Sequence, residues 1–171
     1  TGARGVSGTL EKDVTLGFVH ELNALLSTKP NLRVVLTRDS DVFLPLAERV
    51  RLARQNEADI FIAVHADTIS LRGLRGATVY TISEKASDEV AQAVASNENL
   101  SDAIAGLTVE SENSEVSDIL IDLMRRETQK FSVNLASTVV GKFQGNIRLI
   151  NNPHRSAGFL VLRAPDVPSI L

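Results

Sequence analysis

His65 is the residue whose place in the sequence is best suited to chemistry. It directly follows an unbroken apolar run, residues 60–64, and Asp67 comes two positions later. Such a run, rich in branched and aromatic side chains, is typical of a strand buried on both faces of a mostly parallel sheet. Ligands of α/β sheets bind just outside the carboxyl ends of the strands. His65 is therefore a candidate for metal binding or catalysis, although a hydrogen-bonded histidine that only ends a strand fits the same pattern.

Glu11 is the second candidate, because it lies in the first turn of a helix expected over about residues 10–27. Strand carboxyl ends and helix amino ends share one rim of a doubly wound sheet, so Glu11 and His65 can meet there. Together they would form part of a zinc site with three protein ligands and an open position for water. The alternative for Glu11 is a carboxylate that only complements the helix dipole. We expect His20 to be structural or on the surface and His154 to be exposed in a polar loop.

Composition excludes several other kinds of protein. The chain has no cysteine, which rules out disulfides, thiolate ligands and a cysteine nucleophile. Its net charge of -3 gives no indication of a nucleic-acid-binding surface. No apolar run approaches the roughly 20 residues that cross a bilayer. A serine hydrolase is not supported either, since the chain lacks a Gly-x-Ser-x-Gly motif.

The remaining pattern predicts an α/β fold. A strand over residues 32–37, a helix over about 46–56 and the buried strand over 60–64 form one βαβ unit. We expect Arg49 on that helix to face mostly outward. Further along, the pattern predicts a strand at 77–82, a long helix over about 114–143, a polar irregular stretch at 146–157 and a last strand at 159–162. The fold class is then a mostly parallel, mixed sheet flanked by helices in three layers, α/β/α, and residues 1–171 form a single domain.

Residues 83–113 interrupt this alternation of strands and helices. Connections between a strand and a helix normally take a few residues, whereas here about 30 intervene. Weak helical spacing runs through the segment, at Val90 and Val94 and again from Leu100 to Leu107. We therefore expect a functional helical insertion.

Several blocks of sequence, in order, carry a resemblance that covers essentially the whole chain. It resembles the zinc-dependent N-acetylmuramoyl-L-alanine amidases, and among them the cell-division amidases of the bacterial periplasm. The blocks are Gly8-Thr9-Leu10-Glu11-Lys12-Asp13, Thr37-Arg38, Leu46-Ala47-Glu48-Arg49-Val50, Ala58-Asp59-Ile60-Phe61-Ile62-Ala63-Val64-His65-Ala66-Asp67, Ala157-Gly158-Phe159 and Leu162-Arg163-Ala164-Pro165-Asp166-Val167-Pro168-Ser169-Ile170-Leu171.

The resemblance implies hydrolysis of the amide between N-acetylmuramic acid and the L-alanine of the peptidoglycan stem peptide. It also implies that Glu11 and His65 are zinc ligands. The family's other ligand, a histidine in an Asp-Pro-Gly-His-Gly-Gly motif, would precede Thr1, and its catalytic glutamate would follow Leu171. Residues 1–171 alone therefore hold an incomplete site, with no catalytic residue of their own, and we expect them to be inactive in isolation.

The resemblance also gives the insertion a role. In the division amidases, such an insert closes the active site until an activator protein with a LytM-type domain moves it. Glu98, in the block Ser96-Asn97-Glu98-Asn99-Leu100-Ser101-Asp102, would then occupy the open zinc position. The alternatives are a solvated helix glutamate at Glu98, or the same role for Glu110, Glu112 or Glu115. The implied location is the periplasm, with no membrane span, and we expect a monomer.

Two further hypotheses remain beside an autoinhibited amidase. A zinc peptidase that cleaves within the stem peptide would use the same ligands. A cell-wall binding domain could keep the fold without hydrolysis. Metal content separates the binding domain from the two enzymes. The identity of the newly freed amine separates the amidase from the peptidase.

Overall fold

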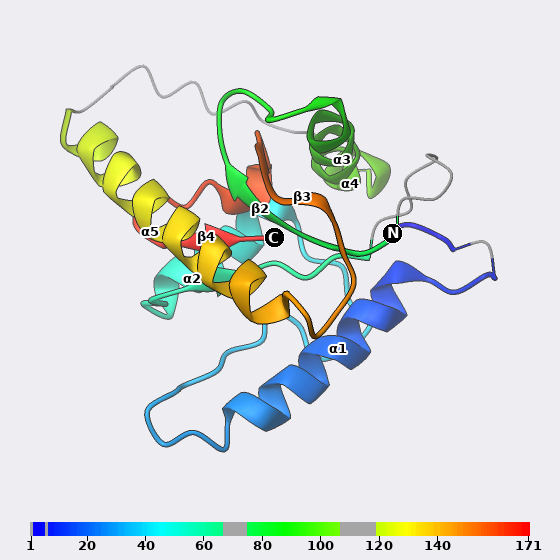
Figure 1. Ribbon diagram of the computed structural model, residues 1–171. Helices are drawn as coiled ribbons and strands as arrows, with labels where there is room; N and C mark the ends of the chain where they lie inside the picture. The colour runs from blue at the N-terminus through cyan, green and yellow to red at the C-terminus, as the bar shows by residue number, and fades with distance from the viewer. Residues whose placement is uncertain (1, 6, 67–74, 107–118) are drawn as a thin grey trace.

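The computed structural model describes residues 2–5, 7–66, 75–106 and 119–171 (Figure 1). No helix among these residues is both long and apolar enough to cross a membrane. The elements follow the order α1 (Glu11–Leu26), α2 (Leu46–Gln55), β1 (Phe61–Ile62), β2 (Ala77–Ile82), α3 (Glu89–Asn99), α4 (Ser101–Ile104), α5 (Ile119–Phe143), β3 (Leu149–Ala157), the 3-10 helix η1 (Leu160–Leu162) and β4 (Ser169–Ile170).

The strands form two parallel ladders, β1 with β4 and β2 with β3. Tyr80 in β2 and Leu171, directly after β4, exchange two backbone hydrogen bonds of 2.7 and 3.0 Å. Such an exchange is typical of antiparallel neighbours. The four strands therefore adjoin in the order β1, β4, β2, β3. The fold is α/β with parallel strand pairs and flanking helices, as the sequence predicts.

Helices cover both faces of β2. Successive strand residues point to opposite faces of a sheet. Tyr80 packs against Phe159, with ring centroids 5.1 Å apart, in an apolar cluster to which α2 and α3 also contribute. Its neighbour Val79 packs with Ala136 of α5 and Ile170 of β4. The core of the molecule therefore lies around β2, between α5 on one face and α2 and α3 on the other.

Three predictions about strands are wrong. Residues 159–162 were expected to form a strand, yet Leu160–Leu162 is a buried 3-10 helix. The polar stretch at 146–157, expected to be irregular, contains β3. Residues 32–37 form no strand in the structure. A fourth, the strand at residues 60–64 buried on both faces, is confirmed only in part, because β1 spans Phe61–Ile62 and Ile60 and Ile62 are 48% and 45% exposed. The predicted strand at 77–82 is confirmed as β2.

The helix predictions agree better with the structure. α1 and α2 lie within one residue of their expected ends. α5 begins at Ile119 within the expected long helix, and residues 114–118 lie outside the described residues. The insertion contains α3 and α4, while its last part, residues 107–113, is likewise outside. Figure 1 shows α3 and α4 above the strands and α1 below them.

Candidate metal centre

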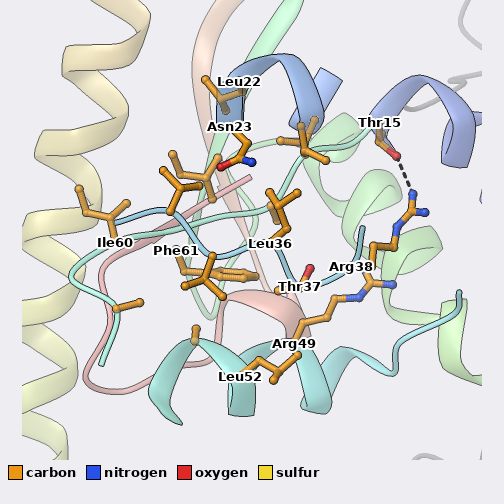
Figure 2. A pocket seen from close by; sticks show the side chains of 18 of the residues that line it. Thr15, Leu22, Asn23, Leu36, Thr37, Arg38, Arg49, Leu52, Ile60 and Phe61 are labelled. Carbon is orange, nitrogen blue, oxygen red and sulfur yellow. Dashed lines mark hydrogen bonds between the residues drawn. The ribbon is translucent and has the colours of Figure 1, made fainter. Parts of the chain in front are cut away.

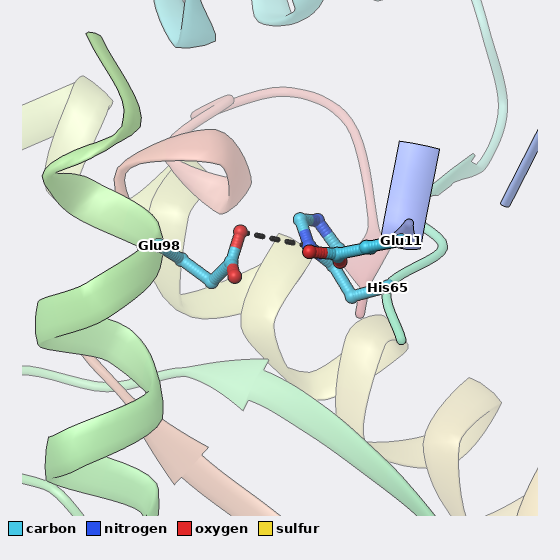
Figure 3. Close-up of side chains that lie close together, drawn as sticks. All are labelled: Glu11, His65 and Glu98. Atoms are coloured by element: carbon cyan, nitrogen blue, oxygen red, sulfur yellow. Dashed lines mark ion pairs between the residues drawn. The ribbon is translucent and has the colours of Figure 1, made fainter. Parts of the chain in front are cut away.

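Three separate elements bring Glu11, His65 and Glu98 together (Figure 3). Glu11 is the first residue of α1, His65 follows β1, and Glu98 is the penultimate residue of α3. Figure 3 shows Glu98 extending from α3 toward the imidazole, with Glu11 on the other side. The structure thus places the two sequence-predicted ligands and the insertion glutamate in one cluster. Glu110, Glu112 and Glu115, the other candidates in the insertion, lie outside the described residues.

The cluster is tight and largely shielded from solvent. Nδ1 of His65 lies 2.7 Å from Oε2 of Glu98 and 3.3 Å from Oε1 of Glu11. The side chains of His65 and Glu11 are 8% and 7% exposed, and that of Glu98 is 15% exposed. One ligand atom from each residue lies within 4.8 Å of the other two. Two carboxylates buried this close to one imidazole require a positive charge among them.

Glu11 is held by backbone groups from two directions. Its Oε2 accepts a hydrogen bond from the Ala3 N–H at 2.8 Å, and its Oε1 accepts one from the Ala66 N–H at 2.9 Å. Burial would raise the pKa of Glu11, but the interaction with His65 and these two backbone bonds outweigh it and lower the pKa to about 2. Glu11 is therefore ionised at neutral pH. Its orientation is fixed, since each oxygen has its own donor.

The two carboxylates change the pKa of His65. Burial would lower its pKa, yet the neighbouring Glu11 and Glu98 raise the pKa to about 9. Although Nδ1 is close to both carboxylates, it is buried without a hydrogen bond of acceptable geometry to any described group. The ring nitrogen is thus aimed into the space between the carboxylates.

This arrangement fits a metal ion. An imidazole nitrogen and carboxylate oxygens are ordinary zinc donors. Two ligand atoms about 2.0–2.1 Å from a tetrahedral zinc lie roughly 3.3 Å apart. The separation of His65 Nδ1 from Glu11 Oε1 is 3.3 Å, whereas the 2.7 Å to Glu98 Oε2 is the shorter distance of a direct ion pair. A buried imidazole nitrogen without a hydrogen bond is also what a metal-binding histidine provides. The cluster could therefore bind a metal, with His65 Nδ1 and the carboxylates as donors.

The other two histidines lie elsewhere. His20 is exposed on α1, and its Nε2 is 3.2 Å from the carbonyl oxygen of Asp39. His154 was expected to be exposed, but it lies in β3 and is partly buried, with Nε2 3.2 Å from Oγ1 of Thr81. Burial lowers the pKa of His154. Neither belongs to the cluster.

Sequence reasoning missed the residues that surround the cluster. Arg49 of α2 was expected to face mostly outward, yet it is largely covered and donates from Nε to the Leu44 carbonyl. Burial lowers its pKa, while the carboxylates of Glu98 and Asp102 act in the opposite direction. The positive charge of Arg49 therefore lies near two acidic residues of the insertion, Glu98 and Asp102. No periodic pattern could reveal this, because the partners come from a separate segment.

A cavity of about 810 Å³ opens beside the cluster (Figure 2). Its walls are α1, the segment 31–38, β1 and α2, and the three residues of the cluster belong to its lining. Figure 2 shows mainly apolar side chains along it, including Leu22, Leu36 and Phe61, with Arg38 and Arg49 at one end. The cluster thus forms part of the lining of a groove with many apolar residues in its walls.

Two solved structures share the fold. One is an N-acetylmuramoyl-L-alanine amidase from Clostridium difficile, with a TM-score of 0.57 and 20% identity, covering 99% of this chain and 69% of that one. The other is the catalytic domain of CwlV, an N-acetylmuramoyl-L-alanine amidase from Bacillus (Paenibacillus) polymyxa. It has a TM-score of 0.54 and 22% identity, covering 99% and 70%. At these identities the comparison shows the fold alone.

Sequence comparisons extend the likeness to the family. The chain is 36% identical over 172 residues to the N-acetylmuramoyl-L-alanine amidase AmiC of Escherichia coli, covering 100% of this chain and 41% of that protein. It is 33% identical over 172 residues to AmiA of Salmonella typhimurium, covering 100% and 59%. The chain thus spans about half the length of these relatives. The family model described as N-acetylmuramoyl-L-alanine amidase matches residues 1–171. With the whole chain matched, it belongs to the N-acetylmuramoyl-L-alanine amidase family.

Proposed function

We propose that residues 1–171 belong to a single catalytic domain that hydrolyses the amide between N-acetylmuramic acid and L-alanine in peptidoglycan. The observation that carries the proposal is the buried convergence of Glu11, His65 and Glu98 on one small volume. Family membership supplies the substrate class. Helices on both faces of β2 support the three-layer α/β/α arrangement for this domain.

The proposed metal is zinc. When bound, zinc polarises a carbonyl oxygen and lowers the pKa of a water molecule to about 7. Glu11 and His65 would hold it, each oriented by its own surroundings. The Ala3 and Ala66 N–H groups fix the Glu11 carboxylate, so the ligand needs no rearrangement. The proposal includes two groups that residues 1–171 do not contain: a second histidine ligand before Thr1 and a catalytic glutamate after Leu171.

We also propose that the insertion, residues 83–113, inhibits the enzyme. Glu98 reaches the cluster from α3 and comes within 2.7 Å of His65 Nδ1. A carboxylate there would fill the position that a catalytic zinc keeps open for water. The zinc position would open to water and substrate once the Glu98 carboxylate is removed from it, either by mutation or by a movement of α3. In this proposal, an activator with a LytM-type domain moves it, the location is the periplasm and the protein is a monomer.

The test is digestion of purified peptidoglycan by the full-length protein, with identification of the newly freed amino termini. We expect free L-alanine amino termini, and several-fold more of them from Glu98→Ala than from wild type. Gln92→Ala is the matched control, because Gln92 is exposed on the same helix. Equal activity of wild type and Glu98→Ala would remove Glu98 from the inhibition.

The same digestion decides between the remaining hypotheses. Release of another amino terminus would favour a peptidase on the stem peptide. A protein that binds zinc and peptidoglycan but releases no amine, with or without Glu98, would be a binding domain. Zinc content, measured by elemental analysis of the purified protein, completes the comparison.

A further inference from the structure

The residues around Glu98 attach the insertion to the rest of the molecule at two points. The first is Asn99, the neighbour of Glu98. Its Nδ2 donates to the Gly158 carbonyl oxygen at 2.8 Å, and its Oδ1 accepts from the Leu160 N–H at 2.8 Å. Both partners lie at the junction of β3 and η1. One side chain thus satisfies a donor and an acceptor of a segment that is about 60 residues away in the sequence.

The second point is Asp102 in α4. Both of its carboxylate oxygens face the backbone N–H of Leu46, at 3.1 and 3.2 Å. Leu46 begins α2, and the residue before it, Pro45, provides no side-chain cap. The first N–H groups of a helix lack partners within the helix, and a negative charge there is favourable. Asp102 therefore supplies from the insertion the cap that α2 lacks in its own sequence.

These two anchors frame Glu98. Asn99 follows it directly, and Asp102 comes four positions later, after the turn that joins α3 to α4. The inner face of α3 adds apolar contact, with Ala91, Val94 and Ala95 buried. The other hydrogen bonds between the insertion and β3 come from Ser83, Ser87 and Asp88, before or at the start of α3. Asn99 and Asp102 therefore provide the anchors at the end of α3 that carries Glu98.

We propose that Asn99 and Asp102 are positioning residues that form a latch, which holds α3 and α4 against the junction of β3 and η1 and against α2 and thereby keeps Glu98 beside His65. The inference deepens the proposed function and rests on it for its effect on activity. Opening the site then means breaking the Asn99 and Asp102 contacts together. A partner that relieves the inhibition would have to compete for them, by offering backbone-like groups to Asn99 or a positive charge to Asp102.

The first measurement is amide hydrogen exchange of the full-length protein, followed over residues 89–104. Asn99→Ala and Asp102→Ala are compared with wild type and with Gln92→Ala, the exposed control on α3. Asn99→Ala removes two hydrogen bonds, so we expect about tenfold faster exchange in this segment, with smaller acceleration for Asp102→Ala. Alanine favours helix more than asparagine does, so a weaker helix cannot be the cause. Asp102→Asn keeps an acceptor for the Leu46 N–H and should restore part of the protection.

The amide hydrogen exchange of residues 89–104 tests whether the latch exists. Acceleration confined to residues 89–104, with β2 and α5 unchanged, supports it. Acceleration no greater than that of Gln92→Ala overturns it, and so does equal acceleration throughout the molecule, which would mean only a general loss of stability.

Basal amidase activity tests the link to inhibition separately. We expect Asn99→Ala to raise activity several-fold in the protein with Glu98 and to add nothing in the Glu98→Ala background. If exchange accelerates locally while neither Glu98→Ala nor Asn99→Ala changes activity, the latch stands and the proposed inhibition fails. If Glu98→Ala activates but exchange in the latch variants is unchanged, the inhibition stands and the latch fails.

Discussion

The two halves of this molecule treat the same kind of apolar side chain differently. In the half built from β2, β3, α3, α5 and η1, here called the closed half, Phe159, Val161 and Leu162 are at most 2% exposed. In the half built from α1, the segment 32–37 and β1, here called the open half, Phe18 is 52% and Val35 is 49% exposed. Exposure is not confined to the open half, since Leu123 and Phe131 on the outer face of α5 are each 56% exposed. Of the first two sets, only the one in the closed half has a covering layer among the described residues.

The difference teaches that a periodic pattern identifies which face of an element is apolar, but not what covers it. Val14, Phe18 and Leu22 lie on one face of α1, as the sequence predicts. Of these three residues only Leu22 lines the groove, together with Val19, whereas Val14 and Phe18 lie outside the lining and are 46% and 52% exposed. Along one edge of β1, the N–H groups of Phe61 and Ala63 donate hydrogen bonds to carbonyl oxygens in and beside β4. No described strand pairs with its other edge.

The cluster of Glu11, His65 and Glu98 lies at the boundary of the two halves. Glu11 comes from the open half, Glu98 from the closed half, and His65 from the loop that follows β1. The boundary combines rigid anchors with access through the groove. This is a common place for a ligand site, since a concave surface and fixed polar groups occur together there.

The largest expected effect is loss of a ring from the closed half. Phe159→Ala removes a fully buried side chain that packs against Tyr80. We expect the free energy of unfolding to fall by about 3–5 kcal/mol. Phe18→Ala, in the open half, should cost less than about 1 kcal/mol, since half of that side chain already contacts solvent. Urea unfolding of both variants measures the contrast, and equal losses would contradict the distinction between the halves.

A glycine pair gives the next effect. Gly76 has φ 142°, and a Cβ there would lie 2.8 Å from the Leu149 carbonyl carbon and 2.9 Å from the Ile150 nitrogen. Gly76→Ala should therefore destabilise by about 2–3 kcal/mol. Gly17 in α1 has nothing within 4 Å of its Cβ position. Gly17→Ala should raise stability by about 0.5–1 kcal/mol, because alanine favours the helix. Thermal unfolding measures both changes, the loss of stability in Gly76→Ala and the gain in Gly17→Ala. A stabilised Gly76→Ala protein would show that β2 does not approach β3 so closely.

Two serines of α5 sharpen the comparison within the closed half. Ser132 and Ser137 both donate to the carbonyl four residues earlier, but only Ser132 also accepts from the Ser169 N–H of β4, at 2.9 Å. Ser132→Ala leaves that buried N–H without its partner and should cost about 1–2 kcal/mol. Ser137 is exposed, so Ser137→Ala should stay within about 0.5 kcal/mol of wild type. Chemical denaturation that finds equal costs would mean that the contact with β4 contributes nothing.

Much of the fold follows from the sequence, and the exceptions have physical reasons. α1, α2 and β2 carry clear periodic patterns, which predict them well. β3 has none, because it mixes Asn, Pro, His and Arg and, among the described strands, pairs with β2 alone. Edge strands tolerate proline and polar residues, since one side needs no ladder. Its register shifts between Ala77 and Val79, which hides any alternation.

The short apolar run at residues 159–162 shows the opposite error. Burial selects apolar residues in a 3-10 turn as strongly as in a strand, so the run alone could not distinguish them. In the site, the proximity of Glu11 and His65 follows from the sequence alone, because helix amino ends and strand carboxyl ends share one rim of the sheet. Glu98 was predicted only through the resemblance. Asn99, Asp102 and Arg49 could not be predicted, because their partners lie in distant segments.

The contact between the tilted rings of Tyr80 and Phe159 has a spectroscopic consequence. Residues 1–171 contain one tyrosine and no tryptophan. The intrinsic fluorescence of this domain therefore comes from a single phenol ring that lies in the closed half. Unfolding of the closed half transfers that ring to water and changes its emission, whereas loosening of α1 leaves its surroundings unchanged. The fluorescence of Tyr80 therefore reports on unfolding of the closed half and does not report on changes in the open half.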